Sequence, residues 1–398
     1  MGSITVTGRG RRRLLRGHPW IYSDDCAEAK GEPGELLTVR APDGASLGWG
    51  LFSTHSKIRV RLVTAEERQP DRAFWAARVR EAVEARGAHG LLAPLGACRL
   101  LSAEADGVPG LVVDRYADVL VVQSGAQASD RMLGFLLELL EEALPFEVGA
   151  ILDRSDTSVR KHEALEPRVE WRKGERSGPV EIVDEADGAA RMVYEVDPVT
   201  GHKTGHYLDQ CANRAYAARF AKGARVLDVF SYDGLFGIRA ALAGAKSVLC
   251  LDQSEASGER LLRNAERNGV ADRVAFERVK ALDDLRGRVE AGESYDLVVL
   301  DPPAFARSKR EIEGALRGYR ELNRRGLQLT APGGVLVSAS CSHNVDRDTF
   351  TRCLADASLD ARRAARIFRF AGPGPDHPVL ATVPETDYLK CAFVRVGS

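Results

Sequence analysis

The sequence predicts an α/β fold class, with a doubly wound, mostly parallel sheet in the carboxyl-terminal half of the chain. From residue 188 onward, short apolar segments that favour strands alternate with longer segments that favour helices. Strands that are apolar on both faces are typical of parallel sheets with helices on both sides. A chain of 398 residues is also longer than one ordinary core accommodates, so we expect further domains before this one.

Residues 1–69 are expected to form a separate β-rich domain. Strand-favouring segments separated by turns cover residues 36–40, 46–53 and 57–64. Helix formers take over near residue 70, where we place the first boundary.

Basic residues gather in this first domain. Lys57, Arg59 and Arg61 alternate with apolar residues, which is typical of a strand with one basic and one buried face. Five arginines precede the first acidic residue of the chain, namely Arg9, Arg11, Arg12, Arg13 and Arg16. On their own they are interpreted most simply as a solvated basic tail.

Residues 70–187 are expected to form a compact α+β domain. Segments 111–116 and 118–123 predict a strand pair, residues 129–144 place leucines at helical spacing, and residues 149–155 predict another strand.

The third domain is expected over residues 188–398. Its predicted strands are 225–230, 247–252, 295–301 and 333–340, and its predicted helices include 254–268 and 310–329. Parallel sheets of this kind bind ligands at the carboxyl ends of their strands, so the residues that follow each strand are candidates for function.

Bulk composition excludes some classes of protein. No apolar segment is long enough to span a membrane, and no secretory signal pattern opens the chain, so we expect a cytoplasmic protein. The seven cysteines are scattered without a C-x-x-C pair, which favours reduced thiols. His202, His206 and Asp209 have only a crude ligand spacing, so no metal is expected.

Acidic residues close the first two strands of the third domain. Asp228 ends the first strand, Gly234 and Gly237 allow a tight turn after it, and Asp252 closes the second strand. No G-x-G-x-x-G or phosphate-binding Lys-Ser/Thr pattern follows, which disfavours a dinucleotide or a nucleoside triphosphate. A carboxylate at each of these strands suits a cofactor with a cationic amino-acid portion and a ribose. The pattern predicts S-adenosylmethionine, with an NAD-type or ligand-free domain as the alternative.

The segment GHKTGHYLDQ, residues 201–210, precedes this domain's first strand. We expect it to cover the methionine part of the cofactor, with Lys203, Tyr207 and Gln210 as polar contacts.

The segment LDPPAF follows the third apolar strand and predicts a base-binding turn. The prolines stiffen it and remove backbone donors, which leaves Asp301 as an acceptor for a ring nitrogen or amine. Phe305 offers a stacking face beside Pro302 and Pro303. Many enzymes that methylate bases share D-P-P-[FY], so it indicates the reaction class and not the target atom.

Cys341 follows the next strand, where a side chain can meet an extruded base. Carbon 5 of cytosine becomes nucleophilic only after a thiolate adds to carbon 6, whereas nitrogen methylation needs no thiol. Asp301 is the expected acid or hydrogen-bond partner near ring nitrogen 3. Cys341 is therefore a candidate nucleophile, although many cysteines at such positions are simply small apolar residues.

Several long motifs resemble the ribosomal RNA large-subunit methyltransferase I family, whose members make 5-methylcytosine in 23S rRNA. They run nearly end to end: RRRLLRGHPWIYS, GWGLFS, DGVPGLVVDRY, DRSD, GHKTGHYLDQ, FSYDGLFG, LDPPAF, SCS and DHPVLATVPETDYLK. The resemblance implies an N-terminal PUA-type RNA-binding domain, a central α+β domain and a Rossmann-like methyltransferase domain.

The resemblance also implies roles for individual residues. Cys341 would be the nucleophile. The cofactor site would include Gln210, Asp228, Phe230, Ser231, Asp252 and Asp301. The arginines near the amino terminus, with Lys57 and Arg59, would contact phosphates.

Two positions depart from the family pattern. Val279 and Lys280 stand where an acid near the adenine is usual, which puts that contact in doubt. His343 stands where glycine is expected after SCS, which can alter the base pocket.

Two alternatives stay open. A sister group that methylates guanine nitrogen shares several motifs but lacks the cysteine, so Cys341 favours cytosine carbon 5. The other is a non-catalytic RNA-binding assembly factor. The expected partner is 23S rRNA or a large-subunit assembly intermediate, and a homodimer is possible.

Overall fold

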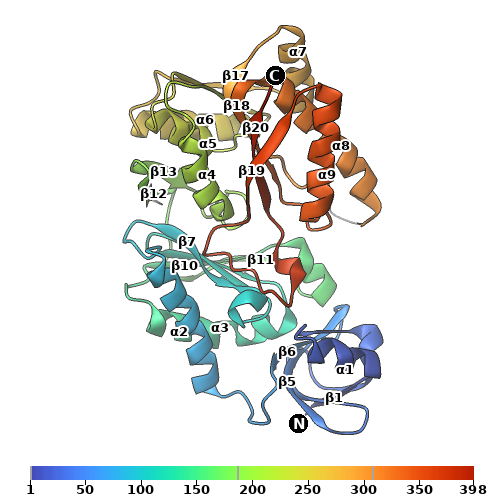
Figure 1. Cartoon of the computed structure of the whole chain (residues 1–398). Helices are drawn as coiled ribbons and strands as arrows, with labels where there is room; N and C mark the ends of the chain where they lie inside the picture. Colours follow the sequence, from blue (N-terminus) through green and yellow to red (C-terminus); the bar gives the residue numbers. More distant parts are fainter. Residues whose placement is uncertain (1, 186–187, 307–308) are drawn as a thin grey trace. The chain divides into compact units, whose positions relative to one another are not determined.

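The computed structural model describes residues 2–185, 188–306 and 309–398 (Figure 1). Its internal contacts divide the chain into two compact units, each made of three stretches. Unit 1 contains residues 1–182, 196–208 and 375–386, and unit 2 contains residues 183–195, 209–374 and 387–398. The domain boundaries expected near residues 69 and 187 stay a prediction.

Unit 1 begins with a six-stranded sheet that includes the strands expected in the first domain. In spatial order the strands are β2 (Trp20–Tyr22), β6 (Ile58–Thr64), β5 (Ser46–Phe52), β4 (Leu36–Arg40), β1 (Ser3–Val6) and β3 (Cys26–Lys30). Alternate residues of these strands, such as Ile4, Val39 and Val60, point into a shared apolar core.

The arginine run near the amino terminus forms helix α1 (Gly8–Leu15), so its interpretation as a basic tail is wrong. The side chain of Thr7 caps the helix by accepting a hydrogen bond from the backbone N–H of Gly10 at 3.2 Å. Arg9 and Arg13 both form ion pairs with the carboxylate of Asp25, which is 1% exposed. The cap and this distant carboxylate hold the helix in place, and charge density alone does not reveal either of them.

The expected basic face of β6 is also only partly present. Arg61 is buried and forms ion pairs with Glu104 at 3.3 Å and Glu163 at 3.0 Å, both in the α+β part of unit 1. The hydropathy pattern could not reveal this, because both carboxylates come from distant segments.

The rest of unit 1 is an α+β layer. Its five-stranded sheet has the order β11 (Arg168–Lys173), β10 (Ala150–Ser155), β9 (Val119–Ser124), β8 (Leu111–Tyr116) and β7 (Ala97–Ser102). Helices α2 (Arg72–Ala88) and α3 (Gln127–Ala143) pack together on this sheet. Trp49 and Leu51 of the first sheet belong to the same apolar core, so the two layers of unit 1 are packed together.

Unit 2 contains the doubly wound sheet, and the predicted fold class is confirmed. Its seven strands have the order β16 (Val274–Arg278), β15 (Ser247–Asp252), β14 (Arg225–Val229), β17 (Tyr295–Leu300), β18 (Thr330–Ser340), β20 (Lys390–Val396) and β19 (Ala365–Ala371). Strands β14 to β18 are parallel, whereas β20 is antiparallel to both of its neighbours. A short pair, β12 (Val180–Asp184) and β13 (Met192–Val196), precedes it in the chain.

Helices cover both faces of this sheet (Figure 1). One face carries α4 (Cys211–Ala218), α5 (Leu235–Leu242) and α6 (Glu255–Arg267), and the other carries α7 (Ala281–Glu290), α8 (Ile312–Leu329) and α9 (Arg347–Ala361). The central strands are therefore apolar on both sides, which explains the pattern seen in the sequence. Among the described residues, no helix has the length and apolar character needed to cross a membrane.

Candidate active site

The predicted residues of the third domain meet at one edge of the sheet in unit 2. Strands β15, β14, β17 and β18 are neighbours and run in the same direction. Asp252 closes β15, Asp228 is next to last in β14, Asp301 follows β17 and Cys341 follows β18. The carboxyl edge of the sheet therefore carries three carboxylates and one thiol.

Asp228 is a buried carboxylate, 1% exposed, that accepts a hydrogen bond from the backbone N–H of Gly237 at 2.9 Å. Gly237 has to be glycine, because a Cβ there would lie 2.6 Å from the sulfur of Cys250. Burial raises the pKa of Asp228 to about 8, the charges of Asp301 and Asp252 add to this, and the bond from Gly237 opposes it. A bound cation would favour the ionised form, so the site suits a ligand with a positive group.

The turn after β14 is held in an unusual backbone conformation. Phe230 and Tyr232 have φ angles of 62° and 49°, and Gly234 has a φ of 76°. Ser231 fixes the turn, because its N–H donates to the carbonyl of Leu251 at 3.0 Å. Left-handed backbone at non-glycine residues costs about 1–3 kcal/mol each and gathers at ligand sites. Gly234 and Gly237 predicted this turn from the sequence, and of the two only Gly234 has a positive φ.

Asp252 stands ready to accept further hydrogen bonds. One carboxylate oxygen accepts from the N–H of Tyr232 at 3.0 Å, and the other accepts from the N–H of Ser254 at 2.9 Å. Each carboxylate oxygen retains acceptor capacity, which is what a pair of ribose hydroxyls requires.

Gln210 connects the start of α4 to the carboxyl edge of the unit 2 sheet. Its side-chain amide donates to Asp301 at 3.0 Å and accepts from the side chain of Asn213 at 2.7 Å. Asn213 also donates to the carbonyl of Gly372 at 3.1 Å. This chain of amides orients the carboxylate of Asp301. Asn213 was not predicted, and its only signal was a polar residue three positions after Gln210.

Lys203 and Tyr207 belong to unit 1. The ammonium of Lys203 lies 4.4 Å from the centre of the Tyr207 ring, and the Tyr207 hydroxyl lies 3.2 Å from Nδ1 of His202. Their role as cofactor contacts stays a prediction.

Cys341 lies against the turn that follows β17. Its sulfur is 3.9 Å from the carbonyl oxygen of Pro302, and the residue is partly buried. Pro302 is buried and Pro303 is exposed. Cys341 and the Asp301–Pro302 turn, 40 positions apart in the sequence, are thus brought together by the β17–β18 pairing.

Phe305 is only partly available as a stacking surface. Its ring packs on Tyr319 of α8, with ring centres 4.7 Å apart and planes tilted by 38°. The Tyr319 hydroxyl is hydrogen-bonded to that of Ser342 at 2.9 Å. Phe305 therefore connects the turn after β17 to the strand end that carries Cys341, through Tyr319 and Ser342.

Lys390 is a further buried group at this edge. It opens β20, is 3% exposed, and its ammonium donates to the carbonyls of Ser342 at 2.8 Å and Tyr388 at 2.7 Å. Burial lowers the pKa of Lys390 to about 8, against the charges of Asp387, Cys341 and Asp346. Lys390 ends the motif DHPVLATVPETDYLK, but the sequence predicted no role for it, because the antiparallel pairing of β18 and β20 is what brings it to Cys341.

The two departures from the family pattern have clear local surroundings. Val279 packs on the apolar core of unit 2, and its N–H donates to the carbonyl of Asp252 at 2.9 Å. Lys280 is exposed. His343 is exposed and its ring lies 5.4 Å from that of Tyr388.

The basic residues predicted to bind RNA lie in unit 1. Arg11 pairs with Asp43 at 3.0 Å, and Arg59 donates to the carbonyl of Ser53 at 2.9 Å. Arg12 and Lys57 are exposed. Contact of these residues with RNA stays a prediction.

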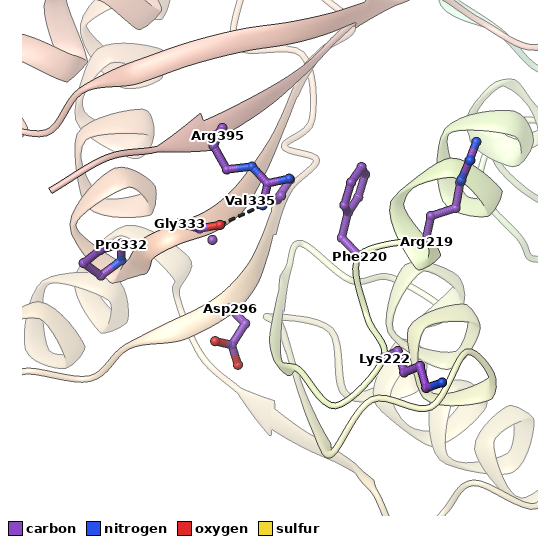
Figure 2. A pocket seen from close by; sticks show the side chains of 9 residues that line it. Arg219, Phe220, Lys222, Asp296, Pro332, Gly333, Val335 and Arg395 are labelled. Atoms are coloured by element: carbon purple, nitrogen blue, oxygen red, sulfur yellow. Dashed lines mark hydrogen bonds between the residues drawn. The ribbon is translucent and has the colours of Figure 1, made fainter.

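A pocket of about 400 Å³ lies at the opposite edge of the unit 2 sheet, where β17 and β18 begin (Figure 2). Arg219, Phe220, Lys222 and Arg395 contribute side chains to it, and Asp296 lies among them. Its position excludes it as the site formed by Asp228 and Cys341. Among the residues that the structure describes, no three acidic, histidine or cysteine side chains are grouped as metal ligands would be.

Comparison with known proteins defines the class of this site. Residues 134–373 match the family model of S-adenosylmethionine-dependent methyltransferases, and residues 4–65 match a PUA-like domain. The chain is a methyltransferase that uses S-adenosylmethionine, as the acids at the sheet edge predicted.

The particular family follows from relatives that match nearly end to end. The chain is 40% identical over 397 residues to the ribosomal RNA large subunit methyltransferase I of Aeromonas hydrophila, covering 98% of each chain. It is 40% identical over 393 residues to the enzyme of the same name from Shewanella denitrificans, covering 97% of this chain and 98% of that one. The chain belongs to the ribosomal RNA large subunit methyltransferase I family.

A solved structure supports the fold. A chain described as a methyltransferase, crystallised with S-adenosylhomocysteine, has a TM-score of 0.84 at 19% identity and covers 99% of this chain and 100% of its own. At this identity the likeness concerns the fold alone.

Proposed function

We propose that this methyltransferase forms 5-methylcytosine in large-subunit ribosomal RNA, with Cys341 as the nucleophile. The observation that carries the proposal is the position of the Cys341 sulfur, 3.9 Å from the Pro302 carbonyl, at the edge where Asp228 and Asp252 also lie. A methyltransferase that acts on a base nitrogen has no use for a thiol at this point.

The residues present fit the cofactor. Asp228, buried and with a raised pKa, would hold the cationic amino-acid portion, and Asp252 would hold the ribose hydroxyls. Phe230, Ser231 and Gly234 shape the turn between them. When bound, S-adenosylmethionine supplies an electrophilic methyl group on a sulfonium.

The protein's own part of the reaction is covalent. The thiolate of Cys341 forms a bond to carbon 6 of the cytosine, which shifts electron density to carbon 5 and lets it take the methyl group. Asp301, oriented by Gln210, holds ring nitrogen 3 or the exocyclic amine by a hydrogen bond. Loss of the carbon-5 proton to a base then breaks the bond between sulfur and carbon 6, and the thiolate is restored.

The proposed substrate explains the remaining parts of the chain. A PUA-like domain at residues 4–65 suits an RNA substrate, and the relatives are named for the large-subunit RNA. We propose 23S rRNA or a large-subunit assembly intermediate as the partner, in the cytoplasm. A homodimer remains part of the proposal to be tested by the mass of the protein in solution.

The test identifies the methylated nucleoside and measures how its formation depends on Cys341. Unmodified large-subunit RNA is incubated with the protein and labelled S-adenosylmethionine, and the labelled nucleoside is identified by mass spectrometry. We expect 5-methylcytidine, and a loss of about a thousand-fold or more in the C341A variant. A methylated guanosine would move the protein to the sister activity, and absence of cofactor binding in calorimetry would favour a non-catalytic assembly factor.

C26A is the matched control. Cys26 is also partly buried with its sulfur near a carbonyl oxygen, that of Tyr22 at 3.4 Å, but it lies in unit 1. We expect C26A to keep the activity of the unchanged protein.

A further inference from the structure

Lys390 stands out among the groups that the proposed reaction leaves unused. It is a lysine only 3% exposed, and burying an ammonium is unfavourable unless an opposite charge or good hydrogen bonds compensate. Its ammonium donates hydrogen bonds to two neutral carbonyls, those of Ser342 and Tyr388. Among the described residues, no carboxylate forms an ion pair with it. The fold thus keeps a positive charge buried on neutral hydrogen-bond partners, and the charges of Asp387, Asp346 and Cys341 favour the ammonium without a direct ion pair.

The backbone places this charge next to the nucleophile. In the antiparallel pairing of β18 and β20, Lys390 lies opposite Ser340, the residue before Cys341. The ammonium is bonded to the carbonyl of Ser342, the residue after Cys341. Lys390 is therefore fixed to the backbone on both sides of the thiol, and its third N–H remains for a partner there.

We infer that Lys390 is the positioning residue that holds Cys341 as a thiolate, by placing an ammonium beside the strand end that carries the sulfur. This rests on the proposed function, because only a reacting thiol needs such a partner. A thiolate is the form that adds to carbon 6, and nearby cations are the usual means of stabilising one. The two carbonyl bonds keep the ammonium in place through the reaction.

The charge balance of the reaction is consistent with this role. The thiolate loses its charge when the bond between sulfur and carbon 6 forms, and regains it when that bond breaks. The ammonium stays protonated throughout and only offsets the charge of sulfur before the addition and after release. No proton has to leave Lys390.

Substitutions of Lys390 can separate the effect of its positive charge from the effect of its hydrogen bonds. K390Q keeps a donor for the carbonyls of Ser342 and Tyr388 but removes the charge, and K390R restores a charge. R395M is the matched control, because Arg395 lies on the same strand and also donates to a carbonyl, that of Gly333 at 2.7 Å, at the far edge of the sheet. Each variant is used as the full-length protein.

The experiment measures how alkylation of Cys341 by iodoacetamide depends on pH, with the modified peptide quantified by mass spectrometry. Only the thiolate reacts, so the midpoint of the rate against pH reports its ionisation. We expect the midpoint to rise by about one pH unit or more in K390Q, to stay low in K390R and to be unchanged in R395M. At pH 7 the K390Q thiol should then react about ten-fold more slowly.

The same midpoint in K390Q and in the unchanged protein would overturn the inference. Alkylation needs neither RNA nor cofactor, so its outcome is independent of the proposed function. If K390Q shifts the midpoint but the unchanged protein yields no 5-methylcytidine, the inferred role of Lys390 is supported and the proposed function is wrong. If 5-methylcytidine forms and the midpoint does not move, the proposed function stands and the role of Lys390 fails. Should K390Q not fold, K390M gives the same comparison without the charge.

Discussion

Buried charges are treated differently in the α+β layer of unit 1 and at the carboxyl edge of the unit 2 sheet. In unit 1, Arg86 is 2% exposed and donates two hydrogen bonds of 2.7 Å to the carboxylate of Asp106. Its guanidinium also donates to the carbonyls of Arg99 and Asp376. At the sheet edge, Asp228 and Lys390 are equally buried but bond only to backbone groups.

This difference distinguishes buried ionisable residues that stabilise the fold from those that serve the proposed reaction. A buried pair that neutralises itself, such as Arg86–Asp106, serves the fold. A buried ionisable group that forms no direct ion pair has a shifted pKa and suits a ligand or a reacting group. Unit 2 also follows the first pattern away from the site, where Arg239 pairs with Asp184.

The largest effect is expected from breaking the structural pair. R86M leaves Asp106 buried without a cation, so we expect the free energy of unfolding to fall by about 3–5 kcal/mol. Chemical denaturation of the variant measures this. Methyl transfer per folded molecule should stay unchanged. A loss of less than about 1 kcal/mol would break the comparison, because the pair would then not be structural.

The next effect is a loss of cofactor binding without a loss of stability. D228N cannot take on the negative charge that a bound cation favours, and we expect the Kd for S-adenosylmethionine in calorimetry to rise about 30-fold. D296N, at the opposite edge of the sheet, should bind normally. Equal affinity in D228N would show that Asp228 does not hold the cofactor.

The pH dependence of stability tests whether Asp228 has a raised pKa in the folded protein. The folded pKa of Asp228, about 8, lies above the ordinary 3.8, so the folded state binds more protons between these values. Stability is therefore lost as pH rises through that window. Asn does not titrate, so D228N should gain stability relative to the unchanged protein between pH 5 and about 8. The denaturation midpoints of D228N and of the unchanged protein are compared at both pH values. The same difference between the two proteins at pH 5 and at pH 8 would contradict this prediction.

Lys390 gives the opposite sign and a smaller effect. Its folded pKa of about 8 lies below the ordinary 10.5, so the unfolded chain binds more protons between these values and stability rises with pH over that window. We expect the unchanged protein to gain about 2 kcal/mol relative to K390M between pH 7.5 and about 10. A constant difference would mean that burial does not lower the pKa of Lys390 in the folded state.

The smallest effect is expected from an exposed pair. Arg72 lies 2.6 Å from Glu142 on the surface of unit 1, and both side chains are more than half exposed. R72A should change the free energy of unfolding by less than about 0.5 kcal/mol, and salt should abolish even that. A loss in free energy of unfolding close to that of R86M would show that burial does not determine how much an ion pair contributes to stability.

Much of the fold was predictable because local pattern and final burial agree. The apolar strands at Arg225–Val229 and Tyr295–Leu300 lie in the centre of the sheet, where both faces are covered. Residues that follow parallel strands share an edge, so Asp301 and Cys341 could be placed together from the sequence alone.

The rest depended on long-range pairing that local pattern does not encode. Asp25 turns the arginines of α1 into a packed helix, and Glu163 draws Arg61 out of an expected basic face. Lys390 reaches Cys341 only through an antiparallel strand inserted between β18 and β19. The left-handed φ of Tyr232 had no signal, because the residue is not glycine.

The central claim is that Cys341 forms a bond to the pyrimidine ring, and trapping that bond tests it most directly. Large-subunit RNA containing 5-fluorocytidine is incubated with the protein and S-adenosylmethionine, since fluorine on carbon 5 blocks the proton loss that releases the thiol. We predict a covalent complex that survives denaturation and maps by mass spectrometry to the peptide with Cys341. Methyl transfer at an undiminished rate by C341A, or a complex that maps to another residue, would contradict the claim.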